Sequence, residues 1–389
     1  MPQSTISVDP VELTRELIRC ASVTPDDDGA LDIVQSAAER LGFTVHRFDF
    51  DGTPNLFARR GNGSPHFCFA GHTDVVPPGS AGWLSDPFAG DVRDGAIYGR
   101  GASDMKGAVA AFLSAVSMLP AVDADAEGEG DGSISLLITG DEEGPATGGT
   151  VRVLQWMAEH GHVPDFCVVG EASNPSHIGQ VIKTGRRGSI NASVSFGGTQ
   201  GHVAYPDGVD NPVHRLVAAL AELAATRLDE GTAHFEASSL QVTTVDVGNT
   251  ATNLVPARAT ASINTRFNDL HTGASLEEHL RTVLARHSDR FTLEATVSGE
   301  AFLPADSPEL QHLSAAVRTT TGITPVFDTG GGTSDARFIS LYCPVAEFGL
   351  TSETIHQVDE RVAIDDLKLL TRVYLATLSR FFARSSVGC

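Results

Sequence analysis

Phe67-Cys68-Phe69-Ala70-Gly71-His72-Thr73-Asp74 is the stretch of sequence that decides the fold. Its first four residues are apolar and predict a buried strand, and an imidazole and a carboxylate follow where that strand ends. In open α/β sheets, ligands collect in the crevice beyond the carboxyl ends of the strands. His72 and Asp74 are therefore candidate site residues, although a His and an Asp at a strand end are more often ordinary turn residues.

Other predicted elements end or begin with the same kinds of side chain. They place Glu142 and Glu143 after strand 133–139, Glu171 after strand 165–169, His356 in the loop after strand 344–348, and Asp104 before helix 108–119. If the strands are parallel, these side chains meet at one edge of the sheet. Each of them has an alternative interpretation as a solvated loop residue, but their joint occurrence favours a site.

The candidate side chains form a ligand set for divalent metal ions. Imidazole and carboxylate together suit Zn, Mn or Co better than they suit metals that prefer thiolates. We expect two metal ions, with Asp104 between them because each of its oxygens can reach a different ion. His72 and Glu171 would complete one site, and Glu143 and His356 the other.

Two further residues have candidate catalytic roles. Glu142 is adjacent to Glu143, so their side chains diverge, and Glu142 is the expected general base that takes a proton from water. Water attack on a carbonyl also needs a donor for the developing oxyanion. His202 is a candidate for that donor, with a structural loop residue as the alternative.

Composition excludes some classes of partner. The chain has 389 residues, 27 basic and 49 acidic, with a formal net charge of −22. This argues against nucleic acid and anionic membranes, which need clustered Lys and Arg. We find neither a signal peptide nor an apolar run of membrane-spanning length, and we expect a cytoplasmic protein. The five cysteines are widely spaced, and we expect buried free thiols: Cys20, Cys68, Cys167, Cys343 and Cys389.

The order of predicted elements indicates one domain inserted into another. The chain alternates helices and apolar strands up to about residue 181, and this α/β pattern resumes after about residue 299. Between them the pattern reads as strand 189–196, helix 211–228, strands 239–247 and 259–268, helix 275–287 and strand 291–298. This order is βαββαβ, a ferredoxin-like α+β unit. We therefore expect a catalytic α/β domain formed by residues 1–182 and 299–389, with an insert at 183–298.

Two helix starts can be predicted from their caps. Asp9 followed by Pro10 predicts a helix N-terminus at the beginning of the chain. Ser275 and Glu278 have the spacing of a capping box, which predicts Ser275 as the cap of the second helix of the insert.

The motifs resemble those of the di-zinc aminoacylase and carboxypeptidase clan. The runs that carry the resemblance are Gly71-His72-Thr73-Asp74-Val75-Val76-Pro77, Gly99-Arg100-Gly101-Ala102-Ser103-Asp104-Met105-Lys106-Gly107, Asp141-Glu142-Glu143-Gly144 and Gly170-Glu171. Within the clan, the chain is most similar to the succinyl-diaminopimelate desuccinylases. The runs that carry this similarity are Ile182-Lys183-Thr184-Gly185-Arg186-Arg187-Gly188-Ser189, Gln200-Gly201-His202-Val203-Ala204-Tyr205-Pro206, Gly331-Gly332-Thr333-Ser334-Asp335-Ala336-Arg337-Phe338, Thr354-Ile355-His356 and Val358-Asp359-Glu360. The resemblance covers essentially the whole chain.

The resemblance implies a fold and an activity. The implied fold is a di-zinc exopeptidase-like catalytic domain with a mixed, mostly parallel sheet and an inserted dimerisation or lid domain. The implied reaction is hydrolysis of N-succinyl-LL-2,6-diaminopimelate to succinate and LL-2,6-diaminopimelate, in the biosynthesis of lysine and cell-wall precursors. The implied cofactors are two Zn²⁺ per subunit, for which Co²⁺ or Mn²⁺ can substitute.

The resemblance also implies roles for particular residues. Asp74 would orient His72, and the insert would form a homodimer in which His202 reaches the partner subunit's site. The implied substrate contacts are Arg186, Ser189, Asn253, Arg266 and Thr333. The alternative activity is that of a related N-acyl amino acid deacylase, such as an acetylornithine deacetylase, or of a dipeptidase. A binding protein that kept the fold is disfavoured, because it has no use for a base at Glu142.

Overall fold

The computed structural model describes residues 7–119, 132–303 and 307–383. These residues form two compact units. The first comprises the described residues of 1–184, 304–328 and 334–389, and the second comprises 185–303 with the short segment 329–333. The expected insert was 183–298, whereas the second unit runs from Gly185 to Leu303 and also takes in Thr329–Thr333. Cys389 lies outside the described residues.

The first unit is built on an eight-stranded sheet with the order β1-β2-β6-β3-β7-β16-β8-β15. The strands are β1 (Thr44–Phe50), β2 (Thr53–Arg60), β3 (His66–His72), β6 (Ser133–Thr139), β7 (Phe166–Val169), β8 (Val181–Lys183), β15 (Val326–Asp328) and β16 (Val345–Glu347). β6, β3, β7 and β16 are parallel neighbours, whereas β1 and β2 pair antiparallel at one side. A small separate sheet contains β4 (Asp91–Arg93), β5 (Ala96–Tyr98) and β17 (Arg361–Ala363).

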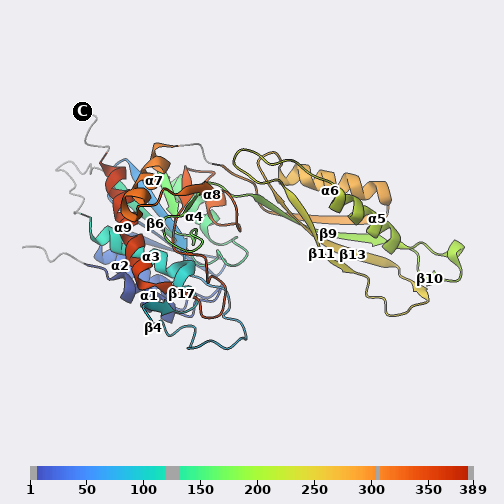
Figure 1. The fold of residues 1–389 in the computed structure, drawn as a ribbon, viewed down its shortest axis with the longest axis horizontal. Helices are drawn as coiled ribbons and strands as arrows, with labels where there is room; N and C mark the ends of the chain where they lie inside the picture. Colours follow the sequence, from blue (N-terminus) through green and yellow to red (C-terminus); the bar gives the residue numbers. More distant parts are fainter. Residues whose placement is uncertain (1–6, 120–131, 304–306, 384–389) are drawn as a thin grey trace, which may run out of the picture. The chain divides into compact units, whose positions relative to one another are not determined.

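Helices cover both faces of the large sheet (Figure 1). One core contains residues of α1 (Pro10–Arg19), α2 (Ala30–Arg40), α3 (Gly107–Ser117), α7 (Pro308–Thr321) and α9 (Ile364–Phe382). Leu56 and Ala58 of β2 point into this core, whereas Phe57 between them contacts Trp156 on the opposite face. Trp156 belongs to α4 (Thr150–Glu159), which contacts the short α8 (Ala336–Ile339). Because both faces are covered, the central strands β3 and β6 are buried along their whole length, as the apolar runs within them predict.

The first helix begins where its cap predicts. The side chain of Asp9 accepts a hydrogen bond from the backbone N–H of Val11, and Pro10 is the first helical residue. The cap satisfies one of the backbone donors that a helix leaves unpaired at its start.

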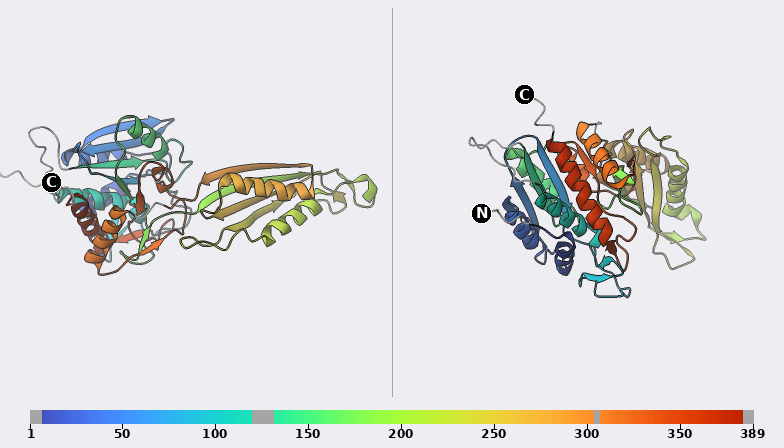
Figure 2. Two further views of the ribbon diagram at one scale, coloured as in Figure 1. Left: turned by 90° about the horizontal axis from the view of Figure 1, so that it is seen from above. Right: turned by 60° about the vertical axis from the view of Figure 1, so that its left-hand side comes forward.

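The second unit has the predicted βαββαβ order. Its antiparallel sheet has the order β11-β13-β9-β14, and helices α5 and α6 cover one face of it (Figure 2). The elements are β9 (Gly188–Gly197), β10 (Gly201–His202), η2 (Pro206–Gly208), α5 (Pro212–Ala225), β11 (Ser239–Asp246), β12 (Leu254–Val255), β13 (Arg258–Phe267), α6 (Gly273–His287) and β14 (Phe291–Gly299). Alternating residues of the strands, such as Val194, Phe196 and Ile263, pack under the two helices.

The predicted cap of α6 is wrong. Thr272 is the N-cap, and its side chain accepts from the backbone N–H of Ser275, which reciprocates as the third helical residue. The capping box therefore lies one turn earlier than Ser275 and Glu278 would place it. Two overlapping polar pairs suit the motif here, and the contacts form at the earlier one.

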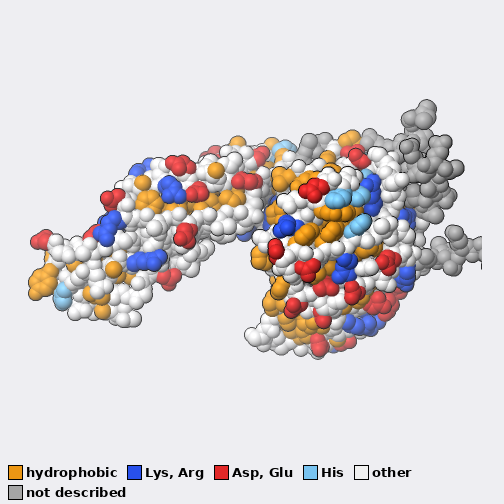
Figure 3. Space-filling model, turned by 180° about the vertical axis from the view of Figure 1, so that it is seen from behind, with side chains coloured by type: hydrophobic (Ala, Val, Ile, Leu, Met, Phe, Trp, Pro, Cys, Tyr) orange, Lys and Arg blue, Asp and Glu red, His pale blue; other side chains and the backbone are white. Residues whose placement is uncertain are grey.

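The described residues bear on the expected absence of membrane-spanning helices, on the surface charge and on the state of the thiols. In them, no helix combines the length and apolar character needed to cross a membrane. Acidic and basic side chains are interspersed on the face shown in Figure 3, without a broad basic area. The four cysteines that the structure describes are buried free thiols, as predicted: Cys20, Cys68, Cys167 and Cys343.

Candidate metal centre

The carboxyl ends of the parallel strands bring the candidate ligands together. His72 is the last residue of β3, and it pairs in register with Thr139 at the end of β6. Glu142 and Glu143 come three and four residues after β6, and Glu171 comes two residues after β7. Because these strands point the same way, all of these side chains lie at one edge of the sheet.

Glycines before two of the candidate ligands make room for Met105, which follows Asp104. A Cβ on Gly71 would lie 2.4 Å from Met105 Cε, and a Cβ on Gly170 would lie 2.7 Å from the same atom. Met105 is fully buried. The Gly-His and Gly-Glu pairs of the sequence therefore allow the Asp104 segment to approach the strand ends closely.

His72, Asp104 and Glu171 form the first group of candidate ligands. His72 Nε2 lies 3.3 Å from Asp104 Oδ1 and 3.7 Å from Glu171 Oε1. Although they are close, His72 Nε2 and Asp104 Oδ1 are buried and make no hydrogen bond. A buried polar atom without a hydrogen bond is costly, so this pair needs another partner.

Asp104, Glu143 and His356 form the second group. His356 Nε2 lies 3.5 Å from Asp104 Oδ2 and 2.9 Å from Glu143 Oε1. The two oxygens of Asp104 thus face different histidines, Oδ1 toward His72 and Oδ2 toward His356. This is the arrangement that a carboxylate bridging two metal ions requires.

The spacing of these atoms fits divalent metal ions. Two ligand atoms about 2.1 Å from one zinc ion at the tetrahedral angle stand about 3.4 Å apart. The separations from Asp104 to His72 and to His356 are 3.3 and 3.5 Å. The donor set of imidazoles and carboxylates, the two orphaned atoms and these separations all suit a pair of ions.

A backbone hydrogen bond fixes the orientation of His72. Its Nδ1 lies 2.9 Å from the carbonyl oxygen of Asp74, which can only accept, so the ring carries its proton on Nδ1. In the neutral ring, Nε2 then has the lone pair, which faces Asp104 and Glu171. A hydrogen bond from the second ring nitrogen is the usual way to set a metal-binding imidazole.

The Asp74 carboxylate makes different contacts from those expected. It lies 3.6 Å from His72 Nδ1, beyond hydrogen-bond distance. It accepts instead from Thr24 Oγ1 at 2.7 Å and from the backbone N–H groups of Glu142 and Glu143 at 3.3 and 3.1 Å. Asp74 therefore orients His72 through its carbonyl group and holds the Glu142–Glu143 turn through its carboxylate.

Glu142 lies beside both groups. One of its oxygens is within 4.8 Å of ligand atoms of His72 and Glu143. Burial and the nearby charge of Glu171 raise the pKa of Glu142 well above its ordinary value. A carboxylate with a raised pKa readily takes a proton from a reacting group, which suits a general base.

The imidazoles hold protons when no metal is bound. Burial disfavours the charged form of His72, but Asp104, Asp74 and Glu171 outweigh it and raise its pKa. Contacts with Asp104 and Glu143 raise the pKa of His356 to about 10. Metal ions must displace these protons to bind.

Several residues that support the site were not singled out from the sequence. Thr24 contacts Asp74, and Asp141 accepts from the backbone of Thr147 and Gly148, which shapes the loop after β6. Asp335 accepts from Thr150 Oγ1, and burial raises its pKa to about 6. Asp141 and Asp335 stand inside motifs that were quoted for the resemblance, so their position in those motifs was the available signal.

The second unit holds all of the remaining candidates. His202 and Asn253 are exposed and lie on the adjoining segments of the β10–β12 pair. His202 Nδ1 accepts from the backbone N–H of Ala204 at 3.1 Å, so the neutral ring carries its proton on Nε2. An outward Nε2–H group is a hydrogen-bond donor, as an oxyanion partner must be.

The other candidate substrate contacts gather near the start of β9. Ser189 of β9 pairs in register with Arg266 of β13. Arg186 is buried and donates to the carbonyl oxygen of Gly330 at 3.2 Å, within the segment that ends at Thr333. Burial and the neighbouring charge of Arg187 lower the pKa of Arg266. Unlike the candidate ligands, these residues all belong to the second unit.

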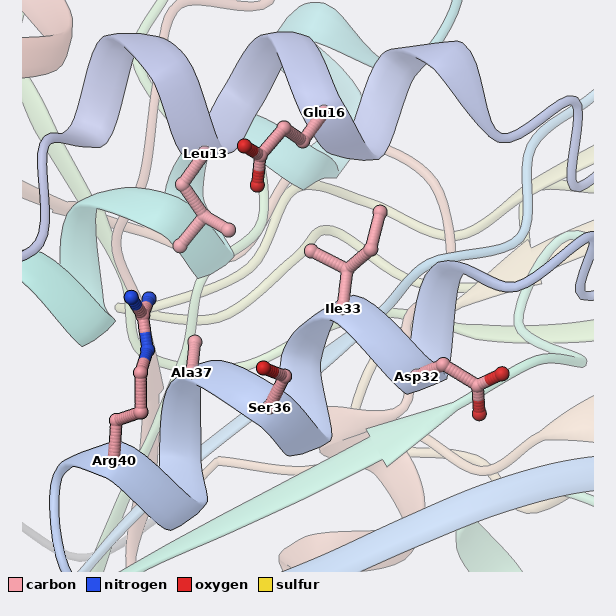
Figure 4. Close-up of a pocket in the computed structure, with 7 residues that line it drawn as sticks. All are labelled: Leu13, Glu16, Asp32, Ile33, Ser36, Ala37 and Arg40. Carbon is pink, nitrogen blue, oxygen red and sulfur yellow. The ribbon is translucent and has the colours of Figure 1, made fainter.

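The first unit has two hollows, and they differ in whether candidate site residues line them. One of about 430 Å³ lies between α1 and α2 (Figure 4) and contains no candidate site residue. Its lining consists of Leu13, Glu16, Asp32, Ile33, Ser36, Ala37 and Arg40. The other, of about 400 Å³, is lined by Glu143 and its neighbours Asp141 and Gly144. Of these two hollows, the second is the one lined by a candidate ligand, Glu143.

Residues 68–380 match the family described as Peptidase family M20/M25/M40. The chain belongs to this family. Its members with known names include a succinyl-diaminopimelate desuccinylase of Gluconacetobacter diazotrophicus, 59% identical over 372 residues, with 95% of this chain and 96% of the relative covered. A second, from Gluconobacter oxydans, is 54% identical, with 98% and 100% covered.

Solved structures of the M20 family have the same fold. The M20 metallo-carboxypeptidase Sso-CP2 of Sulfolobus solfataricus aligns with a TM-score of 0.77 at 17% identity, over 96% of this chain and 99% of that one. A Bacillus subtilis protein described as a dinuclear metal binding peptidase aligns with a TM-score of 0.69 at 15% identity, over 95% and 97%. The predicted fold class, a mixed α/β sheet with an inserted α+β domain, is confirmed.

Proposed function

We propose that the protein is a metal-dependent amide hydrolase that converts N-succinyl-LL-2,6-diaminopimelate and water to succinate and LL-2,6-diaminopimelate. One observation carries the proposal. A complete set of candidate ligands, with Glu142 beside it, occurs in an M20 chain that is 59% identical to a desuccinylase over nearly its whole length. This reaction would place the enzyme in the biosynthesis of lysine and of cell-wall precursors.

The proposed cofactors are two Zn²⁺ ions per subunit, with Co²⁺ or Mn²⁺ as substitutes. His72 and Glu171 would hold one ion and Glu143 and His356 the other, with Asp104 between them. When bound, such ions lower the pKa of water and polarise a carbonyl group.

The chain's own residues then move the proton. Glu142 accepts a proton from the attacking water, whose oxygen forms a bond to the succinyl carbonyl carbon. The C–N bond breaks, and Glu142 returns the proton to the departing amine nitrogen. The raised pKa of Glu142 suits both steps, because the group must first take and then release a proton near neutral pH.

The second unit would supply recognition. His202 presents its Nε2–H as a donor to the oxygen that becomes negative during attack. The substrate has several carboxylates, which need local cationic and hydroxyl partners on a protein of net charge −22. Arg186, Ser189, Asn253, Arg266 and Thr333 are the proposed partners.

We propose further that the second unit forms the interface of a homodimer, in which His202 serves the partner subunit's reaction. A cytoplasmic location is proposed with it, because the substrate belongs to cytoplasmic biosynthesis.

The decisive experiment compares two substrates on the purified, metal-loaded protein. Release of free amine is measured with N-succinyl-LL-2,6-diaminopimelate and with N-acetylornithine. We expect kcat/KM to be at least 100-fold higher for the succinylated substrate. A preference for N-acetylornithine would overturn the assignment in favour of a sibling deacylase.

A further inference from the structure

Glu360 is a buried carboxylate that binds the backbone of the Asp104 segment. It is fully inaccessible to solvent. Its Oε1 accepts from the N–H groups of Ser103 and Asp104 at 3.0 and 3.1 Å, and its Oε2 accepts from Gly101 N–H at 3.1 Å. Three backbone donors on one carboxylate fix the path of the chain that carries Asp104.

Arg100 extends these contacts to the His356 segment. Its Nη1 donates to Glu360 Oε2 at 2.8 Å and to the carbonyl oxygen of Gln357 at 3.2 Å. Its Nη2 donates to the carbonyl oxygens of His356 and Pro77 at 3.5 and 3.4 Å. Arg100 is itself buried, so these are hydrogen bonds from a charge that is shielded from water.

The His356 turn has a particular need for this support. His356 has a φ of 59°, in the left-handed region that side chains with a Cβ rarely adopt. Such a conformation is strained and persists where the surroundings fix it. The contact from Arg100 to the carbonyl group of His356 is one such restraint.

We infer that Glu360, acting through Arg100, is a positioning residue that holds Asp104 and His356 at the separation needed to bind the second metal ion. The Arg100–Glu360 pair contacts the segments of two members of the Asp104, Glu143 and His356 group. In the group of His72, Asp104 and Glu171, the pair contacts only the segment of Asp104. The inference rests on the proposed function, because that function supplies the metal ions.

The two groups should therefore respond unequally when the pair is broken. Glu360→Gln removes the charge, leaves Arg100 uncompensated and turns an amide N–H group toward backbone donors. We expect the dissociation constant of the weaker-binding metal ion to rise at least 10-fold. That of the tighter ion should change less than threefold, because the hydrogen bonds of Arg100 and Glu360 go to the segments that carry Asp104 and His356.

The test is a calorimetric titration of the metal-free full-length protein with Co²⁺, followed also by the visible absorption of bound Co²⁺. Asp229→Asn is the matched control, since Asp229 likewise binds backbone and side-chain N–H groups of Gly231 and Asn268, but in the second unit. It should bind both ions as the wild type does. The activity of Glu360→Gln should return toward the wild-type value at high Co²⁺, which a general loss of stability would not allow.

The outcomes separate the inference from the proposed function. Wild-type protein that binds fewer than two Co²⁺ ions contradicts the proposed metal centre. Wild-type protein that binds two, with Glu360→Gln unchanged or weakened equally at both sites, overturns the inference alone. If Glu360→Gln does not fold, Arg100→Lys replaces it, because a lysine keeps the charge but cannot reach all of the carbonyl groups. The same two Co²⁺ dissociation constants are then measured on that variant. Loss of folding in both variants would assign the pair to stability and also overturn the inference.

Discussion

Asp104 is the side chain that both groups of candidate metal ligands share. Its oxygens lie 3.3 Å from His72 Nε2 and 3.5 Å from His356 Nε2, so each oxygen has its own imidazole. Its backbone N–H is held by Glu360. The position of Asp104 is therefore fixed from the main chain, which leaves both carboxylate oxygens available to ligands.

Mutation should distinguish the roles of the adjacent residues Glu142 and Glu143. We expect Glu142→Gln to bind two metal ions and to lose turnover by a factor of about 10²–10⁴, because the base is lost while the ligands remain. Glu143→Gln, the matched variant, should instead bind one ion weakly, since Glu143 contacts His356. Metal content by elemental analysis and kcat by amine release measure the two effects.

Loss of a metal ion from Glu142→Gln, with Glu143→Gln fully loaded, would reverse the two assignments. Equal turnover of Glu142→Gln and wild type would remove Glu142 from the reaction.

His66 at the start of β3 predicts a dependence of stability on pH. It is buried, its Nε2 lies 2.8 Å from Ser135 Oγ, and burial with the nearby Arg59 charge lowers its pKa from 6.5 to about 4. Folding thus favours the neutral ring. The stabilisation is complete above pH 6.5 and is lost as the pH falls toward 4, by about 3 kcal/mol in total.

The measurement is urea unfolding of the metal-free protein between pH 4 and 7. His66→Gln cannot titrate, so its unfolding free energy should fall less steeply than that of the wild type over this window. Parallel curves for the two proteins would contradict the prediction. Removing the metal ions keeps the protonation of their ligands common to both proteins.

At the scale of elements, the strand ends bring the candidate ligands together, and two glycines allow the Asp104 segment to approach those strand ends closely. β3 and β7 are parallel neighbours, and Gly71 and Gly170 lie at their ends beside Met105. The sequence predicted these strands well, because buried parallel strands have continuous apolar sequences. It did not predict the role of the glycines, since a close approach depends on a segment far along the chain.

Gly170→Ala should destabilise the first unit. Its Cβ would lie 2.6 Å from Phe69 Cζ, and Phe69 cannot move because it is fully buried and stacks on Phe112 at 4.3 Å. Overpacking of this kind costs about 1–3 kcal/mol. Gly82→Ala is the control, because no atom lies within 4 Å of its added Cβ.

Urea unfolding of both variants measures the difference. Equal stability of Gly170→Ala and wild type would show that Phe69 has room to shift. A weaker affinity of Gly170→Ala for metal ions is expected as well, because Glu171 follows directly.

At the scale of the whole molecule, the candidate residues divide between the two units. All of the proposed metal ligands belong to the first unit, and all of the proposed substrate contacts, with His202, belong to the second. The βαββαβ order of the second unit was predicted from its sequence, but the inclusion of Thr329–Thr333 was not. That segment is only five residues long, and residues 304–328 of the first unit separate it from the rest of the second unit. No local sequence pattern therefore marks it.

This division predicts that metal binding and substrate binding can be altered independently. Arg266→Gln should raise KM by about 10- to 100-fold, because a charge-assisted contact with a substrate carboxylate is lost. The metal content should remain at two ions per chain. Arg258→Gln, on the same strand but exposed and bonded to Ser195 Oγ, should leave both quantities unchanged.

An unchanged KM in Arg266→Gln would remove this residue from the substrate contacts. Loss of metal from the same variant would contradict the independence of the two functions.

The sequence by itself determined the four strands whose ends carry candidate residues, the order of elements in the insert and the residue types of the centre. These depend on periodicity, caps and turns, which act over a few neighbouring residues. The tertiary structure alone decided which atoms meet: the carbonyl group of Asp74 on His72, its carboxylate on the Glu142–Glu143 turn, and Glu360 on the Asp104 segment. Such contacts join residues that are far apart in the chain. Their distances are set by the register of the sheet and the packing of its loops, and neither is written in any single stretch of sequence.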